Sequence, residues 1–213
     1  MNYNGKKVPD VVIRRLPRYY RYLGEFLKQG INRISSGYLS EKMNVTASQI
    51  RQDFNYFGGF GQQGYGYNVE HLYKEIGAIL GIDEGYATII VGAGHLGHAL
   101  ANHSTFEKRG FKISAVFDSD ASKIGEIING VPVLPMDNLQ AYIKENNIKI
   151  AILAVPKSAT AEVADKLVEY GIKGLCNFSY VELESGRVAV ENVHFTDSLM
   201  TLAYKIKQNE TEE

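Results

Sequence analysis

The stretch IIVGAGHLGHAL, residues 89–100, decides the fold class of this chain. An apolar run ends at Gly92, two more glycines follow at Gly94 and Gly97, and a segment with alanine and leucine continues from there. A G-x-G-x-x-G pattern binds the pyrophosphate of a dinucleotide when it lies between a strand and a helix. The pattern alone is weakly specific, so the surrounding sequence has to supply that context.

After residue 86, short apolar runs alternate with helical segments. The runs are ATIIVG, KISAVFD, VPVL, KIAILAVP and IKGLCNF, and the helical segments lie near 95–108, 137–146 and 158–170. This alternation predicts an α/β domain with a parallel sheet and crossover helices over residues 86–194. The glycines then lie between its first strand and first helix, as a Rossmann-type nucleotide site requires.

Each glycine has its own role in such a turn. Gly92 permits the sharp bend, Gly94 lets the backbone approach a pyrophosphate, and Gly97 lets the helix pack closely on the strand. Asp118 ends the second strand, where a carboxylate can bond the adenine ribose and repel a 2′-phosphate, so NAD(H) is favoured over NADP(H). The predicted cofactor site comprises Gly92, Ala93, Gly94, His95, Leu96, Gly97, Asp118, Val155, Pro156, Asn177 and Phe178.

Several alternatives stay open for this domain. It could be a Rossmann-like fold without a dinucleotide, or a related fold that binds coenzyme A, and Phe178 could equally be a core residue. An NAD-dependent oxidoreductase would need a substrate domain, yet few residues follow the last strand. No catalytic residue and no metal site are predicted, because His95 and His98 lack a third ligand at metal-binding spacing.

The N-terminal part, residues 1–82, has a different character. Apolar residues at helical spacing over 12–27 predict an amphipathic helix with a basic face, which we expect to restart or kink at Pro17. Two short helices follow, Ser36 to Met43 and Thr46 to Tyr56, with Thr46 as a capping residue and Gln49 three residues on. Two short helices joined by a tight turn predict a helix-turn-helix.

The segment FGGFGQQGYGYNV, residues 57–69, alternates glycines with aromatic residues. Beside a helix-turn-helix, a two-stranded ribbon of this kind indicates a wing that lies along DNA, and a hairpin that only covers the core is the alternative. A helix is expected over about 69–80. Residues 1–70 hold ten Lys and Arg against five Asp and Glu, whereas residues 71–213 hold thirteen against nineteen, which fits a polyanion-binding part joined to one that is not.

The segment TDSLMTLAYKIKQ, residues 196–208, predicts a terminal amphipathic helix, placed at 195–209. It either folds back on its own sheet or crosses to a second subunit, and the second is favoured because helix-turn-helix proteins usually bind two-fold sites as dimers. The chain has no long apolar run and no signal-like start, so we expect no membrane contact and a cytoplasmic protein. Its single cysteine, Cys176, fits a reducing compartment and is interpreted as a core residue.

From residue 8 to 207 the chain resembles the redox-sensing transcriptional repressor Rex family. The similarity is carried by RRLPRYYRYL, ISSGYLSEKMNVTASQIRQDFNYFGGFGQQGYGYNV, IVGAGHLGHAL, FEKRGFKISAVFDSD, ILAVP, GIKGLCNF and VENVHFTDSLMTLAYKI. The resemblance implies a homodimer with N-terminal winged-helix domains, NAD(H)-binding Rossmann domains and exchanged C-terminal helices. It also implies that NADH releases the protein from an inverted-repeat operator in double-stranded DNA, whereas the DNA-bound protein tolerates NAD⁺.

Family positions map onto this chain by the matching motifs. The resemblance implies that Arg21 joins an interdomain contact network and that Phe195 lies near the nicotinamide site of the partner. The implied DNA-binding residues are Ser48, Gln49, Arg51, Gln52, Asn55 and Tyr56 on the recognition helix, with Gln63, Gly64, Tyr65 and Gly66 on the wing.

The chain also departs from the family pattern. Gln62 and Gln63 stand where many members have Lys-Arg, and Gln52 stands where lysine is frequent. Each lost cation should remove the salt dependence of about one phosphate contact, so we expect a different base preference or affinity for DNA. His194 and His103 replace an aspartate and a tyrosine that are thought to help switch the dimer. The implied switch residues are therefore Arg21, His103 and His194. Whether the two histidines take part in switching stays open.

Overall fold

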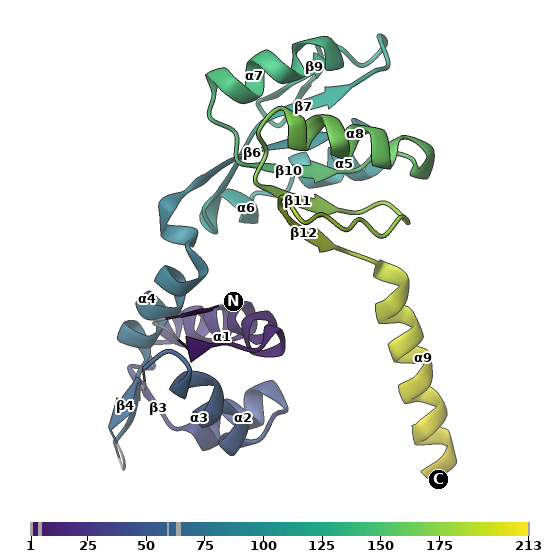
Figure 1. Cartoon of the computed structure of the whole chain (residues 1–213). Helices are drawn as coiled ribbons and strands as arrows, with labels where there is room; N and C mark the ends of the chain where they lie inside the picture. Colours follow the sequence, from purple (N-terminus) through teal and green to yellow (C-terminus); the bar gives the residue numbers. More distant parts are fainter. Residues whose placement is uncertain (1, 4–5, 59, 63–64, 213) are drawn as a thin grey trace. The chain divides into compact units, whose positions relative to one another are not determined.

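The structure, a computed structural model, describes residues 2–3, 6–58, 60–62 and 65–212 (Figure 1). The chain divides into two compact units, Met1–Asp83 and Glu84–Glu213. The first is mainly helical and the second is built on a large sheet, so the α/β fold class with a separate helix-turn-helix unit is confirmed. Among the described residues, no helix is both long and apolar enough to cross a membrane.

Four helices build the first unit: α1 (Asp10–Lys28), α2 (Ser36–Met43), α3 (Ala47–Asn55) and α4 (Val69–Leu80). Helix α1 buries one apolar face, and its Tyr20 ring stacks on Tyr73 of α4 at 4.1 Å between centroids. The side chains of Ser35, Thr46 and Asn68 accept hydrogen bonds from the first turns of α2, α3 and α4, so each of these helices begins at a side-chain cap.

Pro17 does not restart α1, contrary to our expectation. The helix runs as one 19-residue element through the proline. A proline inside a helix removes one hydrogen bond and is unfavourable. Here the flanking residues Leu16, Tyr19 and Tyr20 are buried in the core of the unit, and their packing holds the helix together.

A three-stranded antiparallel sheet completes the helix-turn-helix unit. Its order is β3 (Arg33–Ile34), β5 (Gly66–Asn68), β4 (Gly61–Gln62). Strands β4 and β5 form the predicted ribbon, and β3, which the sequence pattern did not suggest, pairs it to the segment before α2. A short hairpin of β1 (Asn2–Tyr3) and β2 (Lys6–Lys7) precedes α1.

The second unit contains a seven-stranded sheet in the order β12-β11-β10-β6-β7-β9-β8. All neighbours in it are parallel except β8 and β9. The strands are β6 (Tyr86–Val91), β7 (Phe111–Asp118), β8 (Ile127–Ile128), β9 (Val131–Pro135), β10 (Ile150–Leu153), β11 (Gly174–Asn177) and β12 (Ala189–Asn192). The sequence pattern did not predict β8 or β12, because both are short edge strands with little apolar periodicity.

Helices cover the two faces of this sheet in separate apolar clusters. Residues such as Val91, Phe117 and Leu153 pack with α7 (Leu139–Glu145) and α8 (Lys157–Glu169). Their neighbours Ile90, Val116 and Ile152 point to the opposite face, toward α5 (His95–Ala101). The segment predicted as one helix over 95–108 is α5 followed by α6 (Thr105–Lys108), and two 3₁₀ turns, η1 (Ile82–Glu84) and η2 (Met136–Asn138), precede β6 and α7.

Helix α9 (Phe195–Glu212) follows directly after β12 (Figure 1). Its large apolar side chains are exposed in the single chain. These are Phe195, Leu199, Met200, Leu202, Tyr204 and Ile206. The alternative in which the helix covers its own sheet is therefore wrong for this chain.

Candidate functional site

The glycine-rich turn between β6 and α5 is shaped by close backbone packing. Gly92 has φ = +107°, and a side chain there would collide with the backbone carbonyl of Ala154. A Cβ on Gly97 would collide with the carbonyl oxygen of Gly92. A Cβ on Gly94 would meet nothing within 4 Å. Two glycines are thus required by the fold itself, whereas Gly94 keeps open space beside the backbone.

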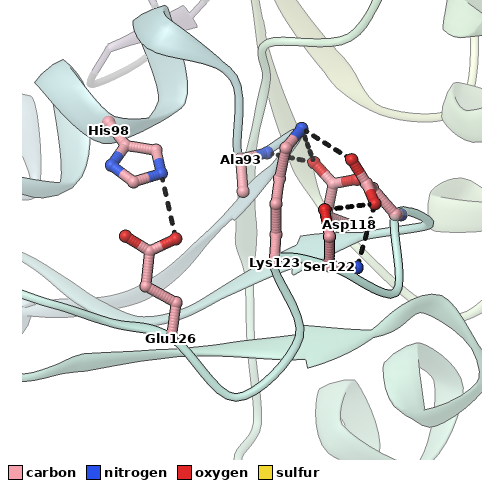
Figure 2. Close-up of polar contacts among 7 residues, drawn as sticks. Ala93, His98, Asp118, Ser122, Lys123 and Glu126 are labelled. Carbon is pink, nitrogen blue, oxygen red and sulfur yellow. Dashed lines mark hydrogen bonds and ion pairs between the residues drawn. The ribbon is translucent and has the colours of Figure 1, made fainter.

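Asp118 lies at the carboxyl end of β7 against this turn (Figure 2). Its Oδ2 accepts a hydrogen bond from the Ala93 N–H at 2.6 Å, and its Oδ1 accepts one from the Asp120 N–H at 2.8 Å. The Nζ of Lys123 lies 3.5 Å from Oδ2. Burial opposes the charged form of Asp118, but the two backbone donors and Lys123 outweigh it and hold the pKa of this carboxyl below its ordinary value. At neutral pH the turn therefore carries a fixed negative charge.

A cavity of about 830 Å³ opens beside the turn, a volume within the range of small-molecule sites. The ends of β6 and β7, the residues 154–156 that follow β10, and the start of α8 line it. Eight predicted cofactor residues line it: Gly92, Gly94, His95, Leu96, Asp118, Val155, Pro156 and Phe178. Ala93 and Gly97 are buried behind the turn, where Ala93 supports Asp118.

Asn177 is placed differently from our expectation. It does not line the cavity, and its side chain is fully buried in hydrogen bonds with Val181, Ser179 and Asn192. The end of a parallel strand predicts proximity to a ligand, but the side chain at that position points into the protein. Asn177 is therefore a structural neighbour of the site.

Sequence reasoning missed several residues of the cavity wall, including Lys123, Lys157, Ser179 and Tyr180. Lys123 belongs to the loop after β7, where it lies within 4 Å of carboxylate oxygens of both Asp118 and Asp120. The segment DSDASK, residues 118–123, could have indicated Lys123, because its acidic side chains attract a nearby lysine. Ser179 and Tyr180 follow β11 and had no signal in the periodicity.

The predicted switch residues in this unit lie at separate places. The His103 ring stacks on Phe106 at 4.9 Å between centroids, and the His194 carbonyl accepts the Asp197 N–H at the start of α9. The Phe195 ring is 62% exposed and lies 5.8 Å from the ring of Phe178 on the cavity wall. Within this chain Phe195 thus places the start of α9 beside the cavity, and its position near the nicotinamide site of the partner stays a prediction.

Two further groups of this unit are the His98–Glu126 pair and the thiol of Cys176. His98 pairs with Glu126 at 3.4 Å (Figure 2), and among the described residues no three His, Cys, Asp or Glu side chains form a group that could hold a metal. Burial, reinforced by Glu191, raises the pKa of Cys176 to about 11. Its thiol therefore stays protonated at neutral pH, which agrees with its interpretation as a packing residue.

The candidate nucleic-acid interface is the outer face of α3. Ser48, Arg51, Gln52 and Asn55 are exposed, while Ile50 and Phe54 of the same helix are buried. Two other predicted DNA contacts face inward in part. Gln49 donates to Asp53 at 2.9 Å, and Tyr56 packs against the core of the unit.

A buried polar cluster fixes α3 from behind. Asp53 is 0% exposed, and its carboxylate accepts hydrogen bonds from the Arg15 Nε and Nη2 and from the Tyr19 hydroxyl, each at 2.7 Å. Burial opposes ionisation, but the bonds from Arg15, Tyr19 and Gln49 hold the pKa of Asp53 below its ordinary value. This cluster, Arg15–Tyr19–Gln49–Asp53, ties α3 to α1, and the sequence pattern did not reveal it.

The ribbon presents Tyr65, which is 70% exposed and whose carbonyl accepts a bond from Arg33. Gly66 has φ = +69°, and a Cβ there would press on the carbonyl of Ile34, so this glycine is needed to seat the ribbon on β3. The predicted contacts Gln63 and Gly64 lie outside the described residues. Arg21, exposed on α1, lies over the Tyr22 ring at 5.5 Å.

Known proteins match the chain over both units. Residues 7–55 match the family described as "Putative DNA-binding protein N-terminus", and residues 83–181 match "CoA binding domain". Proteins named redox-sensing transcriptional repressor Rex are 53% identical in Clostridioides difficile (strain 630), covering 96% of this chain and 98% of that protein, and 49% identical in Caldicellulosiruptor bescii, covering 97% and 95%.

Solved structures agree with these relatives. The crystal structure of RSP in complex with β-NAD⁺ and operator DNA is 51% identical in sequence, with a TM-score of 0.89 over 97% of this chain and 95% of that one. RSP in complex with β-NADH is 48% identical with the same TM-score and covers 97% of each chain. At this identity over nearly the whole length, the chain belongs to the Rex family of redox-sensing transcriptional repressors, which are regulators and not enzymes.

Proposed function

We propose that this protein represses transcription as a homodimer that binds inverted-repeat operator DNA and leaves it when NADH binds. The observation that carries the nucleotide part is the charged Asp118 beside the open space at Gly94, within one cavity. A pyrophosphate can approach the backbone there, the first N–H groups of α5 favour its charge, and the carboxylate can bond the ribose hydroxyls. RSP, a relative of about 50% identity, has been solved with β-NAD⁺ and operator DNA and with β-NADH.

For DNA we assign direct contacts to the exposed residues of α3: Ser48, Arg51, Gln52 and Asn55. Their exposure on one helix face, opposite the buried Ile50 and Phe54, suits a helix that enters the major groove. Gln49 and Tyr56 support this face from its edge. The ribbon with Tyr65 and Gly66, and with Gln63 and Gly64, is assigned to the adjacent groove.

The exposed apolar face of α9 supports the dimer. An apolar helix face that its own chain leaves uncovered is normally buried in an assembly. We assign it to a second copy of this chain, with exchange of the C-terminal helices. A DNA-binding regulator of this kind would act in the cytoplasm.

The switch requires NADH to favour one dimer arrangement over another, because a ligand that binds both equally shifts nothing. Two recognition helices must lie about 34 Å apart to enter successive major grooves, so a change in the dimer can move them off register. We assign the sensing contact to Phe195 beside Phe178, and the transmission to Arg21, His103 and His194.

Coenzyme A is a second candidate ligand, favoured by the family description that residues 83–181 match. The Asp118 carboxylate disfavours it, because coenzyme A carries a 3′-phosphate on the ribose that a carboxylate would repel. Binding of coenzyme A in place of NADH would support this candidate.

The test is selection of duplexes from a random pool by the purified full chain, in parallel with NAD⁺, NADH and coenzyme A. We expect enrichment of an inverted repeat with NAD⁺ and its loss with NADH. Enrichment that ignores NADH and responds to coenzyme A would replace the proposed ligand. The absence of any enriched sequence would remove the DNA-binding role.

A further inference from the structure

The side-chain amide of Asn177 is saturated by four hydrogen bonds at the end of β11. Its Nδ2 donates to the Val181 carbonyl at 2.6 Å and to Asn192 Oδ1 at 2.8 Å. Its Oδ1 accepts from the backbone N–H of Ser179 at 3.0 Å and from the Ser179 hydroxyl at 2.8 Å. An amide offers two donors and two acceptor positions, so Asn177 has none left for a ligand.

Asn192 is the register partner of Asn177 in the β11–β12 ladder. Besides the bond from Asn177, its Oδ1 accepts from the Leu183 N–H at 3.1 Å, and its Nδ2 donates to the Leu183 carbonyl at 3.0 Å. The backbone adds a further link, because the Val193 N–H donates to the Asn177 carbonyl at 2.8 Å. The segment between Asn177 and Leu183 is thus bound at both ends to one pair of asparagines.

This segment forms part of the cavity wall. Phe178, Ser179 and Tyr180 line the cavity, so a ligand there contacts the chain that the asparagines hold. On the other side, only Val193 and His194 separate Asn192 from the start of α9 at Phe195. The Phe195 ring in turn contacts Phe178 at 5.8 Å between centroids.

We propose that Asn177 and Asn192 are positioning residues that couple the nucleotide cavity to α9, so that a change at the Phe178–Tyr180 wall is passed to the dimerisation helix. A fully satisfied buried polar network specifies a single local arrangement. The wall and the start of α9 therefore move together and not independently. This inference rests on the proposed function, since it concerns how NADH binding reaches the dimer.

The measurable quantity is the coupling factor, the ratio of the Kd for DNA at saturating NADH to the Kd without NADH. By linkage it equals the ratio of the Kd values for NADH on the DNA-bound and free protein. A residue that only stabilises the fold would alter stability or affinities but leave this ratio unchanged. The probe is a fluorescent duplex that carries the inverted repeat enriched in the selection above.

Three variants of the full chain test the proposal. Asn192→Ala removes the bond from Asn177 and both bonds to Leu183, and we expect the coupling factor to fall at least tenfold. Asn192→Asp keeps the acceptor for Asn177 and for the Leu183 N–H but sets a second oxygen against the Leu183 carbonyl, so its coupling factor should fall less than that of Asn192→Ala. Asn146→Ala is the control, because Asn146 is an exposed residue whose side chain donates to the Tyr142 carbonyl of α7, and it should change nothing.

Each outcome decides one question. An unaltered protein whose DNA binding ignores NADH would overturn the proposed function, whatever the variants do. If the unaltered protein responds, an unchanged coupling factor in Asn192→Ala, or a loss in Asn192→Asp as large as in Asn192→Ala, would overturn the coupling role alone. If Asn192→Ala does not fold, Asn192→Thr takes its place, because it suits a strand but is too short to bond both partners.

Discussion

Two aspartates, Asp53 in the first unit and Asp118 in the second, have similar chemistry and opposite availability. Both have a pKa held below the ordinary value by hydrogen-bond donors and a cation. The side chain of Asp53 is 0% exposed, whereas that of Asp118 is 11% exposed and lines a cavity. The difference shows that protein donors can enclose a buried carboxylate on all sides, as at Asp53, or leave one side open to a cavity, as at Asp118.

Removal of the Asp53 carboxylate should have the largest effect. In Asp53→Ala, Arg15 and Tyr19 lose their partner, and breaking a buried ion pair of this kind typically costs about 3–5 kcal/mol. We expect that decrease in the free energy of unfolding of the first unit, measured by denaturant titration, together with loss of DNA binding. The control Asp10→Ala breaks an exposed pair with Arg14 and should leave both unchanged. A stable Asp53→Ala variant that still binds DNA would contradict the anchor role.

The second largest effect should come from the glycine turn beside Asp118, where one substitution lowers both stability and nucleotide binding and another lowers binding alone. Gly97→Ala forces a Cβ onto the Gly92 carbonyl, and overpacking of this kind costs about 1–3 kcal/mol, so both stability and NADH binding should fall. Gly94→Ala adds a methyl group only to open space. We expect an unchanged free energy of unfolding but weaker NADH binding. The fluorescence of NADH measures that binding. Tight NADH binding by Gly94→Ala would show that the nucleotide does not approach this turn.

Asp118→Asn should change the choice of nucleotide more than its overall binding. The variant keeps the size of the side chain but removes the charge that would repel a 2′-phosphate, and Lys123 nearby then favours that phosphate. We expect the preference for NADH over NADPH to fall about tenfold, as one charge-assisted hydrogen bond is worth about 1.5–3 kcal/mol. Asp120→Asn is the matched control in the same loop. An unchanged preference would remove Asp118 from nucleotide selection.

Acid should have the smallest effect, and the enclosed carboxylate of Asp53 is one group through which it acts. Because the pKa of Asp53 is lower in the folded protein than its ordinary value of 3.8, its contribution to stability is present above that value. The contribution is lost as the pH falls through the lower pKa of the folded state. The stability difference between the unaltered protein and Asp53→Ala should therefore shrink below about pH 4. A difference that stays constant down to pH 2 would mean that Asp53 is not the titrating group.

Much of the fold could be predicted from local patterns. The α2 and α3 segments, the helix from Val69 and five parallel strands followed from periodicity, capping residues and the glycine turn. The short edge strands β8 and β12 could not, because their few residues carry too little pattern. The expected restart at Pro17 was wrong, because the local rule gave way to the burial of its neighbours in α1.

The candidate site shows the same division. Gly92, Gly94 and Asp118, which were expected from backbone rules, line the cavity, and their binding of a nucleotide stays a prediction. Asn177 was misplaced, because strand position gives the sheet edge but not the partners of a side chain. Lys123 and Tyr180 were missed because loops bring them to the wall.

The sequence by itself determined that a helix-turn-helix unit precedes a parallel-sheet unit with a nucleotide turn, since these features depend on contacts between near neighbours in the chain. Only the tertiary structure decided that Asp53 is enclosed, that Asp118 is open to a cavity, and that Asn177 is hydrogen-bonded to Asn192. Those outcomes depend on groups far apart in sequence, such as Arg15 and Asp53, that only folding brings within hydrogen-bonding distance.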